Sequence, residues 1–365
     1  MSIVTDTLAH CLQRRLTFAA FRWNGKVHLW VNSDPALERI AWEELDGSKD
    51  VFVVAPFIPH PAECTVLRSD LKFILDDDVD LKALAAARSG RPAAAPITVH
   101  WEKEGHTTAV EKVKAEISDR ALEKVVLSRT KELPLDPYFI PQLFEQALQE
   151  QPEAFVCLFN SPVHGTWLGA SPEMLIAAEG EKLRVDAIAG TLPLKAAPEN
   201  AEDWGEKERE EQELVTRSVL NTFLEDELKG VNVSGPHVLK AAHVAHLHSV
   251  VKADLGGRSL SKLVRALHPT PAVCGTPKQK ALNAILRYEP HDRALYAGFW
   301  GPWKCKGATA LYVNIRCARL LSDRALLYLG GGITAGSDAE KEWMETEYKA
   351  LTWQRPIEAL HTRIS

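Results

Sequence analysis

Charged residues near the C-terminus are spaced so that they could hold a divalent cation. The segment 340–349 predicts a helix, on which Glu342, Glu345 and Lys349 would share one ridge because residues three and four apart are surface neighbours. Carboxylate oxygens are ligands that Mg²⁺ accepts, and Mg²⁺ usually keeps waters or substrate oxygens in its other positions. The pattern indicates an anionic ligand held through a metal. The alternative is a solvated helix face, which is the commoner meaning of such a run.

Three consecutive glycines, at 330–332, stand between this run and the apolar segment 326–329. Residues without Cβ allow unusual backbone angles and let a ligand approach backbone N–H groups closely. We therefore expect a strand, a glycine corner and an acidic helix in this order.

A second acidic run, at 206–213, has the same character. Glu208 and Glu211 are three residues apart, and Lys207 lies four residues before Glu211. Alone, such a run is more often a salt-bridged, solvated face. Two acidic helices in one chain also permit a shared metal site, to which each helix donates one carboxylate.

Two residues further upstream could move protons. Lys124 precedes apolar, strand-forming residues, so it either reaches back to solvent or enters the core, where it could pair with a carboxylate or act as a base. Glu173 follows Ser171 and Pro172 between two apolar segments. Restricted solvent access would raise the pKa of its carboxyl group and favour a general acid, whereas the alternative is a loop carboxylate that caps nearby N–H groups.

Several other residues could contact a ligand. Arg316, placed in a strand by the pattern of 312–317, needs a carboxylate partner if it is buried. The corner at 189–191 offers a backbone N–H and a hydroxyl for a carboxylate. Zinc is disfavoured at His243, His246 and His248, because their spacing suits no single helix face and no cysteine lies near. One histidine facing a substrate is the better interpretation.

Composition narrows the class of protein. The 365 residues are 45% hydrophobic and 25% charged, which is ordinary globular usage. A net charge of −6 argues against nucleic acid as a partner. The six cysteines show no CxxC pairing, no apolar stretch approaches ~18 residues and the N-terminus has no secretory pattern. We expect a cytoplasmic protein without membrane contact.

The order of elements predicts an α+β fold. Strands are expected at 17–31, 51–58, 124–128, 154–160, 166–170, 174–178, 182–188, 295–301 and 309–320, and helices at 81–87, 107–123, 141–149 and 200–228. Short connections favour large antiparallel sheets, packed as a two-sheet core with helices outside. A breaker-rich loop at 88–96 marks a soft boundary between regions 1–95 and 96–365 of one integrated domain.

These pieces together resemble the chorismate-utilising enzymes, which include isochorismate, salicylate, anthranilate and aminodeoxychorismate synthases. The resemblance covers about residues 120–355, and the first hundred residues match only loosely. Its motifs are Lys-Val-Val-Leu-Ser-Arg at 124–129, Gly-Ala-Ser-Pro-Glu at 169–173, Ala-Gly-Thr at 189–191, Glu-Lys-Glu-Arg-Glu-Glu at 206–211, His-Leu at 246–247, Leu-His-Pro-Thr-Pro-Ala at 267–272, Ile-Arg-Cys-Ala at 315–318, Gly-Gly-Gly-Ile at 330–333 and Glu-Trp-Met-Glu-Thr at 342–346.

The resemblance implies a reaction on chorismate, a cyclohexadiene with two carboxylates, assisted by Mg²⁺. Glu211 and Glu345 would hold the metal, with Glu208 and Glu342 as supporting carboxylates. The substrate-binding positions that it implies are Gly190, Thr191, His246, Ala272, Tyr296, Arg316, Gly331 and Lys349.

The resemblance also assigns the two proton-transfer residues. Glu173 would protonate the departing C4 hydroxyl, and Lys124 would take a proton from a water that attacks C2. Amine-forming members of the family typically have glutamine at the position of Lys124, because ammonia needs no such base. The lysine therefore points to isochorismate, which feeds menaquinone or siderophore biosynthesis. The alternatives are a salicylate synthase, which goes on to eliminate pyruvate, and a non-catalytic chorismate-binding protein.

Some positions depart from the family pattern. The family often has Asp and His at the positions of Glu208 and Gln212, a basic residue at Leu192 and Gly-Ala-Gly at 330–332. The departure at Leu192 affects the expected substrate contact near Thr191. No glutaminase subunit is expected, since no ammonia is needed, and we expect a monomer or a weak dimer.

Overall fold

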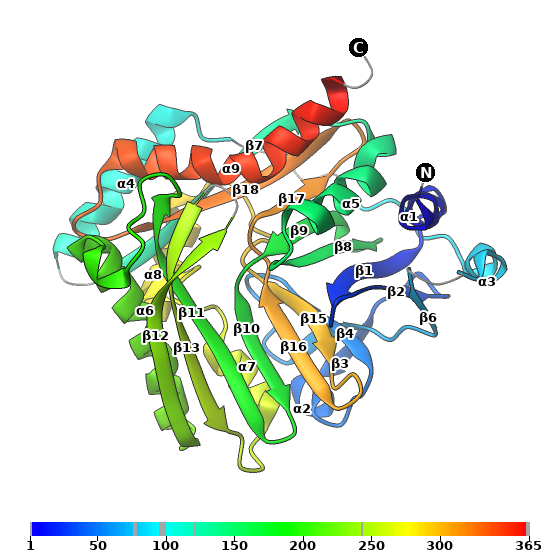
Figure 1. Ribbon diagram of the computed structural model, residues 1–365, viewed down its shortest axis with the longest axis horizontal. Helices are drawn as coiled ribbons and strands as arrows, with labels where there is room; N and C mark the ends of the chain where they lie inside the picture. The colour runs from blue at the N-terminus through cyan, green and yellow to red at the C-terminus, as the bar shows by residue number, and fades with distance from the viewer. Residues whose placement is uncertain (1, 76–78, 95–99, 120–121, 242–243, 363–365) are drawn as a thin grey trace.

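Two large antiparallel sheets and surrounding helices make up the fold (Figure 1). The computed structural model describes residues 2–75, 79–94, 100–119, 122–241 and 244–362. The predicted α+β class, with a two-sheet core and helices outside, is confirmed. The predicted boundary between 1–95 and 96–365 falls on residues 95–99, which lie outside the described residues.

Each sheet draws strands from both halves of the chain. The first sheet has the order β14 (Gly275–Thr276), β7 (Lys124–Pro134), β18 (Arg324–Ile333), β17 (Cys317–Leu320), β9 (Gly165–Ser171), β8 (Phe155–Ser161), β1 (Thr17–Trp23), β2 (Lys26–Asn32) and β6 (Leu71–Ile74). The second sheet has the order β12 (Lys229–Ala241), β13 (Val244–Asp254), β11 (Lys182–Pro193), β10 (Met174–Glu179), β16 (Ala308–Val313), β15 (Phe299–Trp303), β4 (Val51–Ala55), β5 (Glu63–Leu67) and β3 (Glu38–Ala41).

Helices cover the sheets, and local sequence explains several of their ends. They are α1 (Ile3–Gln13), α2 (Trp42–Leu45), α3 (Leu81–Ala86), α4 (Lys103–Ser118), α5 (Ile140–Glu150), α6 (Glu206–Glu225), α7 (Leu260–Leu267), α8 (Lys278–Tyr288) and α9 (Ala339–Thr362). Ser2 and Ser259 accept backbone N–H groups in the first turns of α1 and α7. The long α9 runs across the first sheet near β18 (Figure 1).

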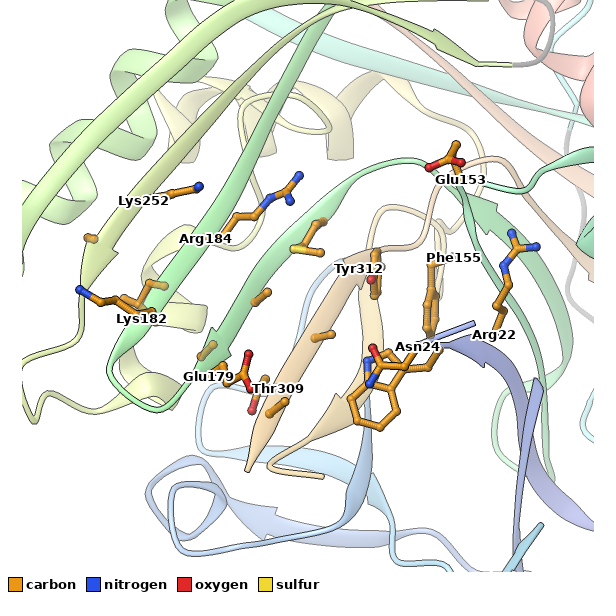
Figure 2. A pocket seen from close by; sticks show the side chains of 18 of the residues that line it. Arg22, Asn24, Glu153, Phe155, Glu179, Lys182, Arg184, Lys252, Thr309 and Tyr312 are labelled. Carbon is orange, nitrogen blue, oxygen red and sulfur yellow. The ribbon is translucent and has the colours of Figure 1, made fainter. Parts of the chain in front are cut away.

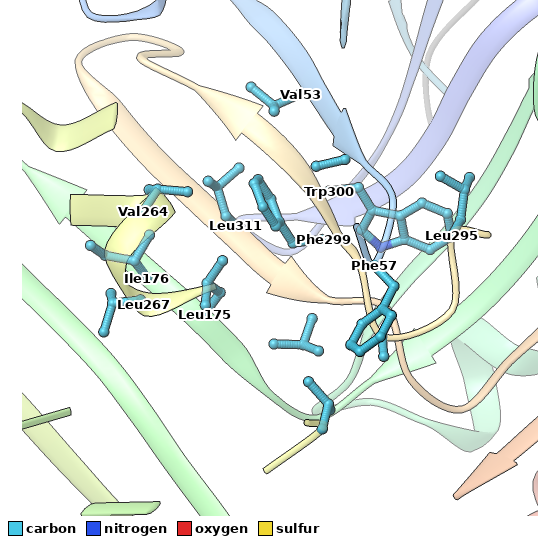
Figure 3. Close-up of a cluster of buried hydrophobic side chains, with 14 of the residues drawn as sticks. Val53, Phe57, Leu175, Ile176, Val264, Leu267, Leu295, Phe299, Trp300 and Leu311 are labelled. Atoms are coloured by element: carbon cyan, nitrogen blue, oxygen red, sulfur yellow. The ribbon is translucent and has the colours of Figure 1, made fainter. Parts of the chain in front are cut away.

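The main hydrophobic core lies between the sheets. Side chains alternate along β1, so that Phe21 joins the core between the sheets while Phe18 joins a second core, to which α1, α5 and α9 contribute. Figure 3 shows part of the main core, where Phe299 of β15 lies near Leu311 of β16. The site described below is built on these rigid layers.

Most predicted elements are present, with shifted ends. The helix expected over 107–123 begins at Lys103 and ends at Ser118, and the strand expected over 295–301 begins only at Phe299. The single strand expected over 309–320 is wrong. The chain leaves the second sheet after β16, bends at 314–316 and joins the first sheet as β17. One run of strand-forming residues does not reveal that its two halves pair with different sheets.

The prediction of a glycine corner at 330–332 is also wrong. These glycines lie inside β18, where Gly330, Gly331 and Gly332 pair with Ser128, Leu127 and Val126 of β7. The ladder to β7 supplies the backbone partners that keep the segment extended. The chain turns only after Ile333 and then enters α9.

Candidate active site

A cavity lies where the end of β18 meets β11, β13, α6 and α9. The predicted site residues that line it are Glu173, Thr191, Glu211, His246, Ala272, Tyr296, Arg316, Glu345 and Lys349. They come from eight separate segments of the sequence, since Glu345 and Lys349 share α9, and from both sheets. The fold therefore gathers most of the predicted residues at one position.

Lys124 begins β7 and is fully buried. Its Nζ lies 2.8 Å from Oε1 of Glu211 on α6, so the lysine enters the core rather than reaching solvent. Burial by itself would raise the pKa of the Glu211 carboxyl, but Lys124, Lys207 and Lys349 together lower it below its usual value. Glu211 is therefore ionised beside Lys124.

The predicted ridge of α9 faces the same region. Lys349 Nζ lies 2.6 Å from Glu345 Oε1, one helical turn away, and Lys207 Nζ of α6 lies 2.6 Å from Glu342 Oε1. Glu342 is 1% exposed, and its Oε2 has no hydrogen-bond partner among the described residues. Burial, followed by the charge of Glu345, raises the pKa of Glu342 to about 7 against the opposing effect of Lys207.

Arg129 of β7 holds α9 in place above the sheet. Its Nε donates to Thr346 Oγ1 at 2.7 Å, its NH2 pairs with Glu347, and its guanidinium lies 3.8 Å from the centroid of the Trp343 ring. These contacts fix the helix next to Glu345. The sequence motifs that begin β7 and α9 are thus in direct contact.

The glycine triplet lets the carboxylates approach the backbone of β18. A Cβ at Gly331 would lie 3.2 Å from Glu342 Oε2 and 3.8 Å from Glu345 Oε1, and a Cβ at Gly332 would collide with Glu211. Side chains at these positions would occupy the space that the carboxylates share. This requirement for space, rather than a turn, explains the glycines.

The donor set suits a hard cation. Mg²⁺ is usually held through one or two carboxylates, and Glu211 and Glu345 line the same cavity while Glu342 keeps one buried oxygen unpaired. No cluster of three or more metal-binding side chains has converged in the part of the chain that the structure describes. Each of these carboxylates faces a lysine instead. The three carboxylates are therefore suited to bind a metal cation at positions that lysine ammonium groups occupy in this structure.

Glu173 is buried between β9 and β10. Its backbone N–H donates to Ser171 Oγ at 3.2 Å, and Thr270 Oγ1 donates to its Oε1 at 3.3 Å. Burial raises the pKa of its carboxyl group to about 8, and the charge of Asp186 acts in the same direction. Glu173 is therefore protonated at neutral pH and can give a proton to a bound molecule.

The prediction that Arg316 lies within a strand is wrong. The residue lies at the bend between β16 and β17, with φ +49°. A non-glycine residue rarely adopts this angle, and such angles occur often at functional sites. Its NH2 donates to His246 Nε2 at 3.0 Å, and the His246 Nδ1–H donates to Thr191 Oγ1 at 3.1 Å. Burial and the charge of Arg316 lower the pKa of His246 well below its usual value, so the ring is neutral.

Arg316 forms no ion pair with a carboxylate among the described residues. Burial lowers the pKa of its guanidinium to about 10, at which it still carries its charge at neutral pH. A buried guanidinium that is oriented by a neutral histidine has its remaining donors available for a ligand carboxylate.

Some of the other predicted residues line the cavity and some do not. Lys349 also donates to the carbonyl of Gly330 at 2.7 Å, and Tyr296 is buried with its ring stacked on Tyr328. Gly190, at φ +67°, forms the bulge that precedes Thr191. Gly190, Gly331, Lys124, Glu208 and Glu342 are not among the residues that line the cavity. The Glu208 carboxylate lies beside Gly205, at the start of its own helix.

A larger groove of about 1050 Å³ contains none of the predicted site residues (Figure 2). Three of the cations on its walls already have partners. Arg184 pairs with Asp186 at 3.0 Å, Lys182 pairs with Asp254 at 2.7 Å, and Arg22 donates to backbone carbonyls. The smaller cavity, with its buried acid and its unpaired guanidinium, is the better candidate for chemistry.

Three residues of the site were given no role by the sequence. They are Lys207, which neutralises Glu342, Thr270, which bonds to Glu173, and Asp186, whose charge acts on Glu173. Lys207 and Thr270 lie within the family motifs, but no local spacing shows these contacts, because the partners lie far away in the sequence. Of the three histidines, His246 lies in the cavity, His248 Nε2 lies 3.2 Å from Asp186, and His243 lies outside the described residues.

Comparison with known proteins identifies the family. The sequence model of a family described as "Chorismate binding enzyme" matches residues 71–357, which is well over half of the chain. The protein therefore belongs to the chorismate-binding enzymes, as the motifs had indicated.

Particular relatives narrow the comparison. Isochorismate synthase DhbC of Bacillus subtilis is 32% identical over 277 residues, which cover 71% of this chain and 69% of that protein. Isochorismate synthase MenF of Escherichia coli is 30% identical over 259 residues, which cover 69% of this chain and 60% of that protein. The chain thus spans about three fifths of the length of MenF and just over two thirds of the length of DhbC.

Solved structures share the fold. A putative 2,3-dihydroxybenzoate-specific isochorismate synthase, DhbC, from Bacillus anthracis has a TM-score of 0.78 at 23% identity, over 97% of this chain and 99% of that one. Anthranilate synthase component I from Streptococcus pneumoniae has a TM-score of 0.65 at 18% identity, over 93% of this chain and 91% of that one. Among the described residues, no helix has the length and apolar character that crossing a membrane requires.

Proposed function

We propose that this protein is a Mg²⁺-dependent isochorismate synthase that converts chorismate to isochorismate. The observation that carries the proposal is a buried and protonated glutamic acid, Glu173, in the same cavity of a chorismate-binding enzyme as Glu211, whose carboxylate pairs with the fully buried Lys124. Its relatives DhbC and MenF are isochorismate synthases. An amine-forming enzyme would not need the lysine, because ammonia is itself a sufficient nucleophile.

In the proposed reaction, two proton transfers take place at opposite ends of the diene. Lys124, as its neutral amine, takes a proton from a water whose oxygen forms a bond to C2, and the ring double bonds shift. The bond between C4 and its hydroxyl breaks as Glu173 gives that oxygen a proton, so that water leaves. Arg316 and Lys349 bind the substrate carboxylates through charge-assisted hydrogen bonds.

Mg²⁺, when bound, would neutralise the ring carboxylate of chorismate and fix its position. Glu211 and Glu345 would hold it, with Glu342 as a supporting carboxylate because its Oε2 is buried and unpaired. The position of Glu208 beside Gly205 supports no direct role for that residue at the metal.

Product analysis tests the proposal. The purified protein is incubated with chorismate and Mg²⁺, with and without EDTA, and the products are separated by chromatography. Isochorismate alone is the expected product. Salicylate with pyruvate would instead support a salicylate synthase, and unchanged chorismate would support a non-catalytic chorismate-binding protein.

Replacing Glu211 or Glu345 by glutamine is expected to raise the Mg²⁺ concentration for half-maximal activity by about tenfold or more, because a neutral amide is a poorer ligand for a hard cation. The measurement is the rate of isochorismate formation across a Mg²⁺ titration. Glu210→Gln, an exposed position on α6, is the control. An unchanged Mg²⁺ dependence in both variants would rule out the assignment.

The pH dependence of kcat/KM should report on Glu173. A carboxyl group with a pKa of about 8 is protonated below that pH and ionised above it, so the acid is present near neutrality and is lost as the pH rises. We expect kcat/KM to fall above about pH 8. A rate that keeps rising through pH 9 would show that this proton is not required.

A methyl group at Gly332 should disturb the site without altering the backbone, because this glycine does not have a positive φ. Its Cβ would collide with Glu211 and lie 3.0 Å from Lys124 Cε. Gly332→Ala is therefore expected to lower kcat/KM by about ten- to a hundredfold. Gly336→Ala is the matched control, since its Cβ would meet nothing within 4 Å. Equal activity of the two variants would argue against the crowded arrangement.

The proposal extends to the cellular role. Isochorismate formed by this enzyme would feed the biosynthesis of menaquinone or of a catechol or salicylate siderophore. Complementation of strains that lack the isochorismate synthase of one pathway or of the other would decide between the two roles. We propose a cytoplasmic enzyme, a monomer or weak dimer, that works without a glutaminase subunit because water is the nucleophile.

A further inference from the structure

Three lysines neutralise the three carboxylates that gather at the glycine triplet. Lys124 pairs with Glu211 at 2.8 Å, Lys349 with Glu345 at 2.6 Å and Lys207 with Glu342 at 2.6 Å. When all six groups are ionised, their charges cancel. A dication added to this partly buried cluster without any rearrangement would face three ammonium groups at close range, which is electrostatically unfavourable.

The three pairs are not equivalent. Glu211 and Glu345 are the proposed metal ligands, and the lysines on them are the two that the proposed reaction needs, namely Lys124 as the base and Lys349 as a substrate-binding cation. Glu342 is only a supporting carboxylate, and Lys207 has no part in the reaction. In each of these two ion pairs, the proposed metal site therefore needs the carboxylate and the proposed reaction needs the lysine.

Lys124 and Glu211 lie close against β18 at Gly332. A Cβ at Gly332 would collide with Glu211 and lie 3.0 Å from Lys124 Cε, so the carboxylate and the lysine already fill the gap beside the strand. Lys124 Nζ is buried and has no hydrogen-bond partner of good geometry among the described residues, even at its short distance from Glu211. The short distance between the two groups is that of an ion pair.

We propose that Lys124 and Lys349 occupy the metal ligands Glu211 and Glu345 in the metal-free protein, and that a divalent metal displaces both lysines. Metal loading then frees the base and the substrate-binding cation in one step. Without metal, both lysines stay engaged with carboxylates and cannot act on chorismate. This inference rests on the proposed function, because it takes the roles of the four residues from it.

Calorimetric titration of Mg²⁺ into the full-length protein without chorismate tests this competition. Lys124→Met and Lys349→Met each remove a competitor, so each should bind Mg²⁺ about tenfold more tightly or better than the wild type. Lys207→Met is the matched control, because it removes the same charge from the cluster but leaves Glu211 and Glu345 with their lysines. An equal gain in all three variants, or no gain in the first two, would overturn the competition.

A crystal structure of the wild-type protein soaked with Mn²⁺ provides a second readout that needs no variant. We expect metal at Glu211 and Glu345, with both lysine nitrogens moved beyond about 4 Å from these carboxylates. Metal at the site with both ion pairs intact would overturn this inference and leave the proposed function standing. Isochorismate formation without any bound metal would overturn both this inference and the metal assignment.

Discussion

Replacing Glu173 by glutamine is expected to lower kcat for isochorismate formation by about 10²- to 10⁴-fold, the usual contribution of a positioned general acid. The amide keeps the size of the side chain and can still accept the hydrogen bond from Thr270. It cannot release a proton to the C4 hydroxyl at neutral pH. The loss should therefore fall on kcat, while chorismate binding, measured by calorimetry or fluorescence, stays close to that of the wild type.

The control for this variant is Glu179→Gln, an exposed carboxylate at the end of the following strand. It should leave both kcat and binding unchanged. If Glu173→Gln keeps more than about a tenth of the wild-type kcat, the proton must come from another source. A loss of chorismate binding as large as the loss of turnover would instead make Glu173 a binding residue.

Replacing Lys124 by glutamine is expected to abolish hydration of chorismate, with a fall in kcat of about 10²-fold or more. Glutamine has no amine that can take a proton from the attacking water. Chorismate should still bind, because Arg316 and Lys349 are retained. The measurement is isochorismate formation at saturating chorismate and Mg²⁺, together with chorismate binding. Near-wild-type turnover would remove Lys124 from the role of base.

Mg²⁺ binding by the same variant separates the two roles of Lys124. If the lysine competes with the metal for Glu211, the Lys124→Gln protein binds Mg²⁺ at least as tightly as the wild type, and its inactivity cannot come from an empty metal site. Lys112→Gln, an exposed lysine on α4, is the control and should behave as the wild type does. Weakened Mg²⁺ binding together with lost turnover would indicate a damaged site rather than a missing base.

The family and most of the fold could be predicted from the sequence because both depend on local patterns. The alternation of apolar residues predicted β8 to β11 within a few residues, and the spacing of Glu342, Glu345 and Lys349 predicted one face of α9. Motifs such as those at 124–129 and 169–173 identified the family without any knowledge of pairing. Nine of the residues named for the site were then found around one cavity.

The bend at Arg316 and the position of the glycines depend on how the strands pair in the two sheets. A run of strand-forming residues looks the same whether it stays in one sheet or crosses to another, so the break between β16 and β17 was not visible in it. The glycines lie within β18 because β7 pairs with them, and the space that they leave is occupied by side chains from α6 and α9.

The sequence alone determined which chemical groups this protein has available: a lysine and a glutamic acid for the proposed proton transfers, two acidic helices, and an arginine for the proposed contact with a carboxylate. Only the tertiary structure decided which of these groups meet. Lys207 and Glu342 are 135 residues apart, and Lys124 and Glu211 lie on different elements that pack together only in the folded chain. Ion pairs of this kind, and the pKa of Glu173, depend on burial and on neighbours from distant segments, which no local spacing encodes.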